Sequence, residues 1–163
     1  MPLSDATLEA ASEMALKSFD TMEGDDDYAP FWFNASLNPG DASEQYKKFD
    51  IKWLQYWLAV DASDKIIGSV GLYERNEDGK EAYWVAWFGV LPEMRRKGVG
   101  KKLLEFVTER TRNAGKKYLR LYTSTSPQEE TAQIVYEKNG FRETGREKLP
   151  HKRNTTIYRE LEL

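Results

Sequence analysis

The most informative stretch of this chain runs from Val90 to Lys102 and reads V-L-P-E-M-R-R-K-G-V-G-K-K. It follows a run of strand-forming residues, 82–90, and leads into a segment with the apolar spacing of a helix. Between Arg95 and Lys102 lie five positive charges and no acid, whereas the whole chain carries a net charge of −3. Backbone N–H groups at a glycine-bearing turn and helix start bind anions, and nearby cations strengthen the binding. The stretch therefore predicts that a small anionic group, such as a diphosphate, is held at this turn.

The composition favours one packed domain over residues 1–163, since 40% of the residues are hydrophobic. The chain has no cysteine and a single histidine, His151, so it offers no thiol nucleophile, no disulfide and no multi-histidine metal site. No apolar run reaches the ~20 residues that a membrane helix needs, and the first residues lack a secretory signal. We therefore expect a cytoplasmic protein without a metal or a membrane partner. The acidic balance also argues against a nucleic-acid partner.

Apolar spacing and turn residues outline the order of the elements. A segment rich in aromatic residues, 28–33, is interrupted by Pro30 and predicts no regular element. Ser126, Pro127 and Glu129 form the pattern of a capped helix start. The predicted elements are a helix over 4–19, a short helix over 41–49, an antiparallel meander of strands over 57–60, 66–73 and 82–90, a helix over 98–114, a strand over 118–123, a helix from 126 to 139, and a last antiparallel pair of strands in the tail. This order predicts a mixed α/β fold, with a mixed sheet flanked by helices.

Two segments in this order resemble the GNAT-type N-acetyltransferases. The first is the stretch already quoted, in which Arg95 to Gly100 matches the family's acetyl-CoA signature of Arg or Gln, two residues, Gly, one residue, Gly. The second is Ala132 to Phe141, A-Q-I-V-Y-E-K-N-G-F, which matches the family's helix ending in Tyr-Glu-Lys-x-Gly-Phe. The likeness covers about residues 57–163 and implies a mixed sheet of about six or seven strands, splayed at the cofactor slot and flanked by about four helices.

The resemblance also implies roles for individual residues. The sheet would open beside strand 82–90, whose end would pair with the pantetheine arm of acetyl-CoA. Tyr136 would stand near the thioester sulfur and protonate the departing thiolate. The residues that would hold the cofactor are Phe88, Gly89, Val90, Arg95, Arg96, Lys97, Gly98, Val99, Gly100 and Lys101. The chemistry agrees, because a phenol with an ordinary pKa of about 10 is a poor base at neutral pH but a competent proton donor.

The sequence departs from the family at the general base and at the fifth strand. Trp84, Ala86 and Tyr122 occupy the places where relatives carry a Glu or a His, and none of them can take a proton from an ammonium group. The sequence leaves three candidates for the general base, which are Glu74, Glu81 and a chain of water molecules. Glu129 stands where relatives often have an Asn that touches the cofactor arm, and Ser124 or Ser126 stays open as a substitute. Only residues 1–3 remain for the family's first strand, which leaves three alternatives: a short strand, no strand, or a strand lost from a trimmed chain.

The sequence as a whole predicts an N-acetyltransferase that moves the acetyl group of acetyl-CoA directly to a primary amine. Direct transfer follows because no cysteine can hold the acyl group. Two features favour a small-molecule acceptor. The aromatic segment 28–33 either lines a pocket for the acceptor or belongs to the core. Asp25, Asp26 and Asp27 either attract a cationic amine or form a solvated loop. The alternative is a non-catalytic domain that binds or senses acyl-CoA. The sequence does not decide whether the protein forms a homodimer.

Overall fold

The computed structural model describes all residues from 1 to 163 and contains one six-stranded sheet with five α-helices. The strands are β1 (Ile51–Val60), β2 (Ile66–Arg75), β3 (Ala82–Val90), β4 (Tyr118–Ser124), β5 (Arg142–Glu147) and β6 (Thr156–Glu162), in the spatial order β1-β2-β3-β4-β6-β5. The helices are α1 (Leu8–Ser18), α2 (Ala29–Leu37), α3 (Ser43–Lys48), α4 (Val99–Asn113) and α5 (Glu130–Lys138). The predicted mixed α/β fold is confirmed, because β3 and β4 pair in parallel while all the other strand pairs are antiparallel.

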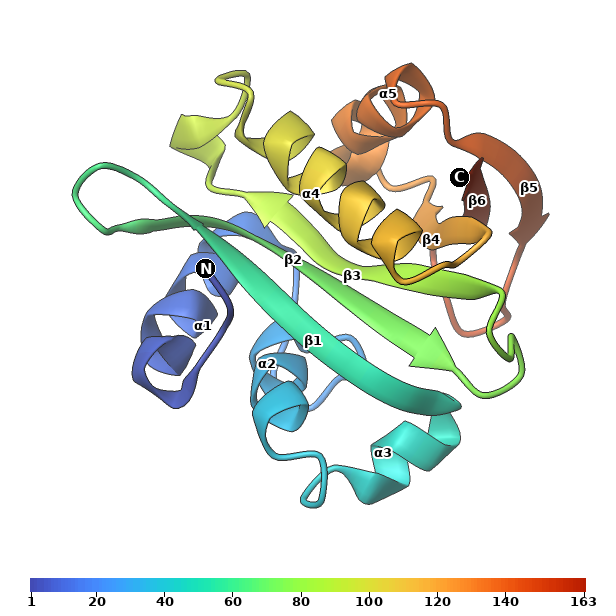
Figure 1. The fold of residues 1–163 in the computed structure, drawn as a ribbon, viewed down its shortest axis with the longest axis horizontal. Coiled ribbons are helices and arrows are strands. Elements are labelled where there is room, and N and C mark those ends of the chain that lie inside the picture. The colour runs from blue at the N-terminus through green and yellow to red at the C-terminus, as the bar shows by residue number, and fades with distance from the viewer.

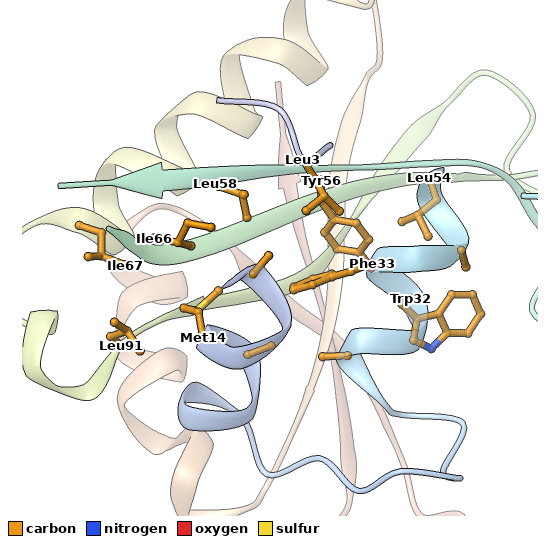
Figure 2. Close-up of a cluster of buried hydrophobic side chains, with 14 of the residues drawn as sticks. Leu3, Met14, Trp32, Phe33, Leu54, Tyr56, Leu58, Ile66, Ile67 and Leu91 are labelled. Carbon is orange, nitrogen blue, oxygen red and sulfur yellow. The ribbon is translucent and has the colours of Figure 1, made fainter. Parts of the chain in front are cut away.

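The helices cover both faces of the sheet, so that two hydrophobic cores form (Figure 1). Helices α1 and α2 pack on one face with the inward side chains of β1 and β2, and α4 packs on the other face with those of β3 and β4. In Figure 2 the first core is centred on Phe33 of α2 and Tyr56 of β1, whose ring centroids are 4.8 Å apart. A side chain at Gly71 would overlap the Tyr56 ring, so the sheet reaches this packing only with a glycine at that place.

Three expectations about the elements are corrected by the structure. The segment 28–33 is not irregular but opens α2, because Pro30 lies in the first turn of that helix, where its missing N–H costs no hydrogen bond. Trp32 and Phe33 are consequently buried in the first core, which is the core alternative left open by the sequence. Strand β1 begins at Ile51, six residues before the predicted start at Trp57.

The third correction concerns the helix start near Ser126. Residues Pro127–Glu129 form a separate 3₁₀ turn before α5, and the Ser126 hydroxyl donates to the side chain of Gln128 instead of capping the helix. The N-terminal residues, by contrast, do form a short strand-like contact, as the sequence allowed. Pro2 bridges to Trp57 on the free edge of β1, and the Leu3 N–H donates to the Tyr56 carbonyl at 3.0 Å.

Candidate active site

The sheet opens between β3 and β4. The two strands pair only at their first residues, through Ala82 with Tyr118, Tyr83 with Leu119 and Trp84 with Arg120. Beyond Trp84 and Arg120, residues 85–90 of β3 and 121–124 of β4 have no strand partner on their facing edges. We call these two facing edges the splay. Because successive peptide groups of a strand point to alternate edges, the splay exposes N–H and C=O groups that an extended ligand can bind.

A bulge in β3 shapes the edge of the splay. Trp87 and Phe88 together oppose the single residue Val70 of β2, and Trp87 takes a left-handed conformation with φ 39°. The buried hydroxyl of Ser69 fixes the bulge by donating to the Trp87 carbonyl at 2.9 Å. The bulge turns Phe88 toward the α4 and α5 face, where its ring lies 5.9 Å from that of Tyr136.

The end of β3 is held from the opposite face by helix α1. A side chain at Gly89 would overlap the ring of Phe19, which follows α1 and packs edge-on against Trp87 at 5.1 Å between centroids. Only a glycine therefore allows α1 to approach the strand this closely. The contact places the bulge and the last residues of β3 at a defined position beside α4.

The turn between β3 and α4 presents a row of free backbone N–H groups. Arg96 and Gly98 are left-handed, with φ 63° and 81°, and the N–H groups of Arg96, Lys97 and Gly98 donate no hydrogen bond within the protein. The next N–H groups, 99–101, belong to the first turn of α4, which has no acceptor inside the helix, and no side chain caps it. The first bond of the helix runs from the Lys102 N–H to the Gly98 carbonyl at 3.1 Å. The turn thus has the unsatisfied donors that a diphosphate requires.

The basic side chains of this turn divide into two groups. Arg95 is tied back to the fold, since its guanidinium donates to the carbonyls of Val90 at 3.2 Å and Ser18 at 3.3 Å. It therefore links the end of α1 to the end of β3. Arg96 has no polar partner, the Lys97 ammonium approaches only the Met94 sulfur at 3.8 Å, and Lys101 lies 3.7 Å from Glu105 on the same helix. Arg96 and Lys97 are thus exposed and free to face an anion at the helix start, and Lys101 is exposed with only its long pair to Glu105.

Tyr136 lies on α5 and faces the splay from the side of the second core. Its side chain is 7% exposed and packs between Phe88 and Phe141, each with a centroid distance of 5.9 Å. Its hydroxyl makes no hydrogen bond within the protein. Burial, and after it the negative charge of Glu129, raises the pKa of the Tyr136 phenol far above its usual value. The group therefore keeps its proton at neutral pH and can donate it, which is the role that the sequence predicts.

Glu129, which stands just before α5, bonds to the end of β4. Its carboxylate accepts a hydrogen bond from the Ser124 hydroxyl, and that hydroxyl accepts one from the Ser126 N–H at 3.2 Å. Gln133 supports the same corner by donating to the Ser124 carbonyl and the Thr123 hydroxyl, both at 3.0 Å. The sequence did not single out this Ser124–Glu129 pair as a proton-accepting group, because the capping pattern at Ser126 assigned Glu129 to the helix start.

The two acids considered as general base have other partners. Glu74 lies on the α4 face between Lys52 at 3.1 Å and Lys116 at 3.3 Å, and although burial opposes its ionisation, these ammonium groups hold its pKa below the usual range. Glu81 precedes β3, at the closed end of the splay, and pairs with Arg120 at 3.2 Å. Neither carboxylate reaches the open end where Tyr136 lies.

The loops on the other face of the splay are joined by ion pairs. Asp27, in the loop between α1 and α2, lies 3.4 Å from Lys152, in the loop between β5 and β6. Asp26 pairs with Lys48 of α3 at 2.7 Å, and its carbonyl accepts the Trp32 indole N–H at 2.7 Å. Asp25 has no partner. The acidic segment is thus exposed, with two of its three carboxylates paired to lysines.

Taken with the fold, these features define an acetyltransferase, and residues 52–143 match the family model described as an acetyltransferase (GNAT) domain. The chain belongs to the GNAT acetyltransferase family. No curated protein matches it. No helix is both long and apolar enough to span a bilayer, and no three His, Cys, Asp or Glu side chains gather as metal ligands.

Several solved structures share the fold. A GNAT-family protein from Desulfovibrio desulfuricans has a TM-score of 0.78 at 16% identity, with 99% of this chain and 96% of that chain covered. The ribosomal-protein-S18-alanine N-acetyltransferase from Escherichia coli has a TM-score of 0.74 at 16% identity, with 99% and 91% covered. A GNAT-family acetyltransferase from Elizabethkingia anophelis with acetyl-CoA bound has a TM-score of 0.58 at 25% identity, with 76% and 82% covered.

Proposed function

We propose that this acetyltransferase moves the acetyl group of acetyl-CoA directly to a primary amine on a small molecule. The observation that carries the proposal is the row of free N–H groups from Arg96 to Lys101, which adjoins the splay. A diphosphate held there lies just beyond the open end of the unpaired edge of β3, where the ring of Phe88 lies 5.9 Å from that of Tyr136. The bound acetyl-CoA of the Elizabethkingia anophelis relative supports the choice of acyl donor.

The residues present fit acetyl-CoA in three places. The N–H groups of residues 96–101, with the side chains of Arg96, Lys97 and Lys101, provide donors and positive charge for the diphosphate. The unpaired edge of β3 at Phe88, Gly89 and Val90 provides backbone groups for the amides of the pantetheine arm. Bound at these places, acetyl-CoA supplies an acyl group activated by its sulfur leaving group.

Tyr136 and the backbone of β3 would serve the chemistry. A free N–H of the splay orients the acyl carbonyl and stabilises negative charge on its oxygen. The Tyr136 hydroxyl, which has no acceptor within the protein, donates its proton to the departing sulfur. Because the chain has no cysteine, the amine attacks the acyl carbon directly, without a thioester on the enzyme.

The acceptor side of the splay supports a small cationic amine. The Asp27–Lys152 pair joins the α1–α2 loop to the β5–β6 loop, which restricts the approach of a folded protein. Asp25 leaves one unpaired carboxylate nearby to attract positive charge. A protein terminus would need the two loops to separate.

A thiol-release assay tests the proposal. Purified protein is incubated with acetyl-CoA and a panel of small primary amines, or with peptides that carry a free N-terminus. We expect release of coenzyme A that depends on a small amine, and a product heavier by one acetyl group. Release with peptides alone would overturn the assignment of the acceptor. Binding of acetyl-CoA without any amine-dependent release would favour a sensing domain instead.

A further inference from the structure

The carboxylate of Glu129 lies beside the splay and forms no ion pair. Glu129 bonds to the hydroxyl of Ser124, the last residue of β4, on the edge that β3 leaves unpaired. Ser124 lies on the same face of β4 as Tyr122, because the side chains of a strand alternate. The Ser124–Glu129 pair therefore connects the face of the sheet that Tyr122 shares with the α1–α2 loop to the start of α5.

Apart from Asp25, in the loop between α1 and α2, most of the other carboxylates around the site have partners. Asp78, Glu81 and Glu160 all bind the guanidinium of Arg120, at 2.9, 3.2 and 2.8 Å. Asp27 pairs with Lys152. Glu147 accepts from the Tyr158 hydroxyl at 2.9 Å, but it lies on β5, at the far edge of the sheet from β3. Each of the first four carboxylates is thus paired with a cation.

Glu129 also lies near the predicted proton donor. Tyr136 follows it by seven residues, and the negative charge of Glu129 adds to burial in raising the pKa of that phenol. The nearby cation is Arg159 of β6, whose guanidinium is bound by Gln133 and Glu137 of α5, each at 2.9 Å. The phenol of Tyr122 on β4 faces Glu129 as well as Asp27, Tyr158 and Arg75, and the exposed Glu130 follows Glu129 on α5. Glu129 forms no salt bridge, and Arg75 pairs with Glu77.

We propose that Glu129 is the general base of the acetyl transfer and that it acts through the hydroxyl of Ser124. The inference rests on the proposed function. The acceptor arrives as an ammonium ion and gives one proton to the Ser124 oxygen while Ser124 passes its own proton to the Glu129 carboxylate. The neutral amine then forms the new C–N bond, the C–S bond breaks, and Tyr136 protonates the sulfur. Tyr136 regains a proton from the amide nitrogen through solvent, and Glu129 later returns its proton to water.

The test compares Glu129→Gln with Glu130→Gln. Both changes remove one negative charge at the start of α5, and glutamine keeps an acceptor for the Ser124 hydroxyl. The rate of thiol release, as kcat/KM for an alkyl amine, is measured from pH 6 to pH 9, and the Kd for acetyl-CoA is measured by calorimetry. Because an amide side chain cannot take a proton, the Glu129→Gln variant must wait for free amine, so its log kcat/KM should rise by about one for each pH unit below an amine pKa of about 10.

At pH 7 we expect Glu129→Gln to lose about 10²- to 10⁴-fold in kcat/KM. The loss should shrink with rising pH, the Kd for acetyl-CoA should stay within about threefold, a difference of under 1 kcal/mol, and Glu130→Gln should behave as wild type. Ser124→Ala, which leaves the carboxylate without its relay, should show the same steep pH dependence.

Each contrary outcome is distinguishable. If wild type releases thiol with an amine but Glu129→Gln matches Glu130→Gln at every pH, the assignment of the base is wrong and the proposed function stands. A weaker Kd with an unchanged pH profile would make Glu129 a cofactor contact and overturn the proposal. Wild-type behaviour of Ser124→Ala would overturn the relay. A wild-type protein that releases no thiol with any amine would remove the proposed function itself.

Discussion

Gly100 gives the sharpest test of where the diphosphate of acetyl-CoA binds. This residue is the second of α4, and its N–H belongs to the free donors at the helix start. A methyl group placed on its Cα would lie 3.5 Å from the Phe88 ring and 3.7 Å from Val90, which are ordinary contact distances. The free protein therefore has room for Gly100→Ala, and the backbone is not left-handed there.

We expect Gly100→Ala to stabilise the free protein and to weaken its binding of acetyl-CoA. An unstrained change from glycine to alanine stabilises by about 0.4–1 kcal/mol, which raises Tm by roughly 1–4 °C for a chain of this size. In a helix, however, the Cα–Cβ bond tilts toward the N-terminus, so the new methyl would project toward the bound diphosphate. Crowding by a methyl costs about 1–3 kcal/mol, or roughly 5- to 150-fold in Kd.

The measurements are a thermal melt and a calorimetric titration with acetyl-CoA. Gly40→Ala provides the control, because a methyl at Gly40 meets no atom within 4 Å and this loop lies between α2 and α3, away from the turn. A Gly100→Ala protein that melts at or above the wild-type temperature but binds acetyl-CoA as tightly would show that the diphosphate does not lie against the start of α4. A large fall in Tm would instead refute the packing argument.

Three further predictions concern single groups. Tyr136→Phe should lower kcat about 10²- to 10⁴-fold with an unchanged Tm, because its hydroxyl bonds to nothing in the free protein; unchanged turnover would exclude Tyr136 as the proton donor. Replacing Arg96 and Lys97 together by Ala should raise the KM for acetyl-CoA about 2- to 30-fold, because each exposed cation contributes about 0.2–1 kcal/mol to binding. The control replaces Arg112 and Lys138 by Ala, which should leave the KM unchanged. An equal rise in KM for both double variants would indicate a general charge effect. Glu74→Gln should lower the free energy of unfolding by about 3–5 kcal/mol at pH 7, because it leaves the buried ammonium of Lys116 unpaired. Folding lowers the pKa of Glu74, so the stabilisation by ionised Glu74 is present above its unfolded pKa of about 4.3 and is lost as the pH falls through the folded value. Chemical denaturation at pH 7 and pH 3 measures the difference in free energy of unfolding between wild type and Glu74→Gln. The same difference at both pH values would refute the argument.

The free N–H donors of the turn between β3 and α4 were predictable from local sequence, because the conformation of a turn depends on its own residues. Gly98 takes the left-handed conformation that the turn requires, and the lack of a capping side chain follows from the residues themselves. The cations of the turn were less predictable. Arg95 belongs to the same run as Arg96, but only the folded chain shows that its guanidinium binds the carbonyls of Val90 and Ser18. Charge spacing alone does not distinguish a ligand-facing arginine from one that joins two elements.

The elements that were predicted wrongly depend on longer-range contacts. Pro30 is compatible with a helix start as well as with a loop, and the burial of Trp32 and Phe33 against β1 decides for the helix. The early part of β1 has exposed Lys52 beside half-buried Trp53, a pattern too weak to identify a strand without its pairing to β2. The bulge at Trp87 depends on the Ser69 hydroxyl, which lies on the neighbouring strand. Periodicity carries no information on any of these contacts.

The general base also could not be predicted from sequence patterns, because it depends on long-range contacts. On the sequence, Glu74 and Glu81 were the nearest acids on neighbouring strands, yet in the fold both are paired with cations. Lys52 and Lys116 occupy Glu74, and Arg120 occupies Glu81. Glu129 lies outside the strands, and only the return of the chain after β4 brings it to Ser124. The partners of each carboxylate in space, which the sequence does not give, therefore support the proposal that Glu129 is the base.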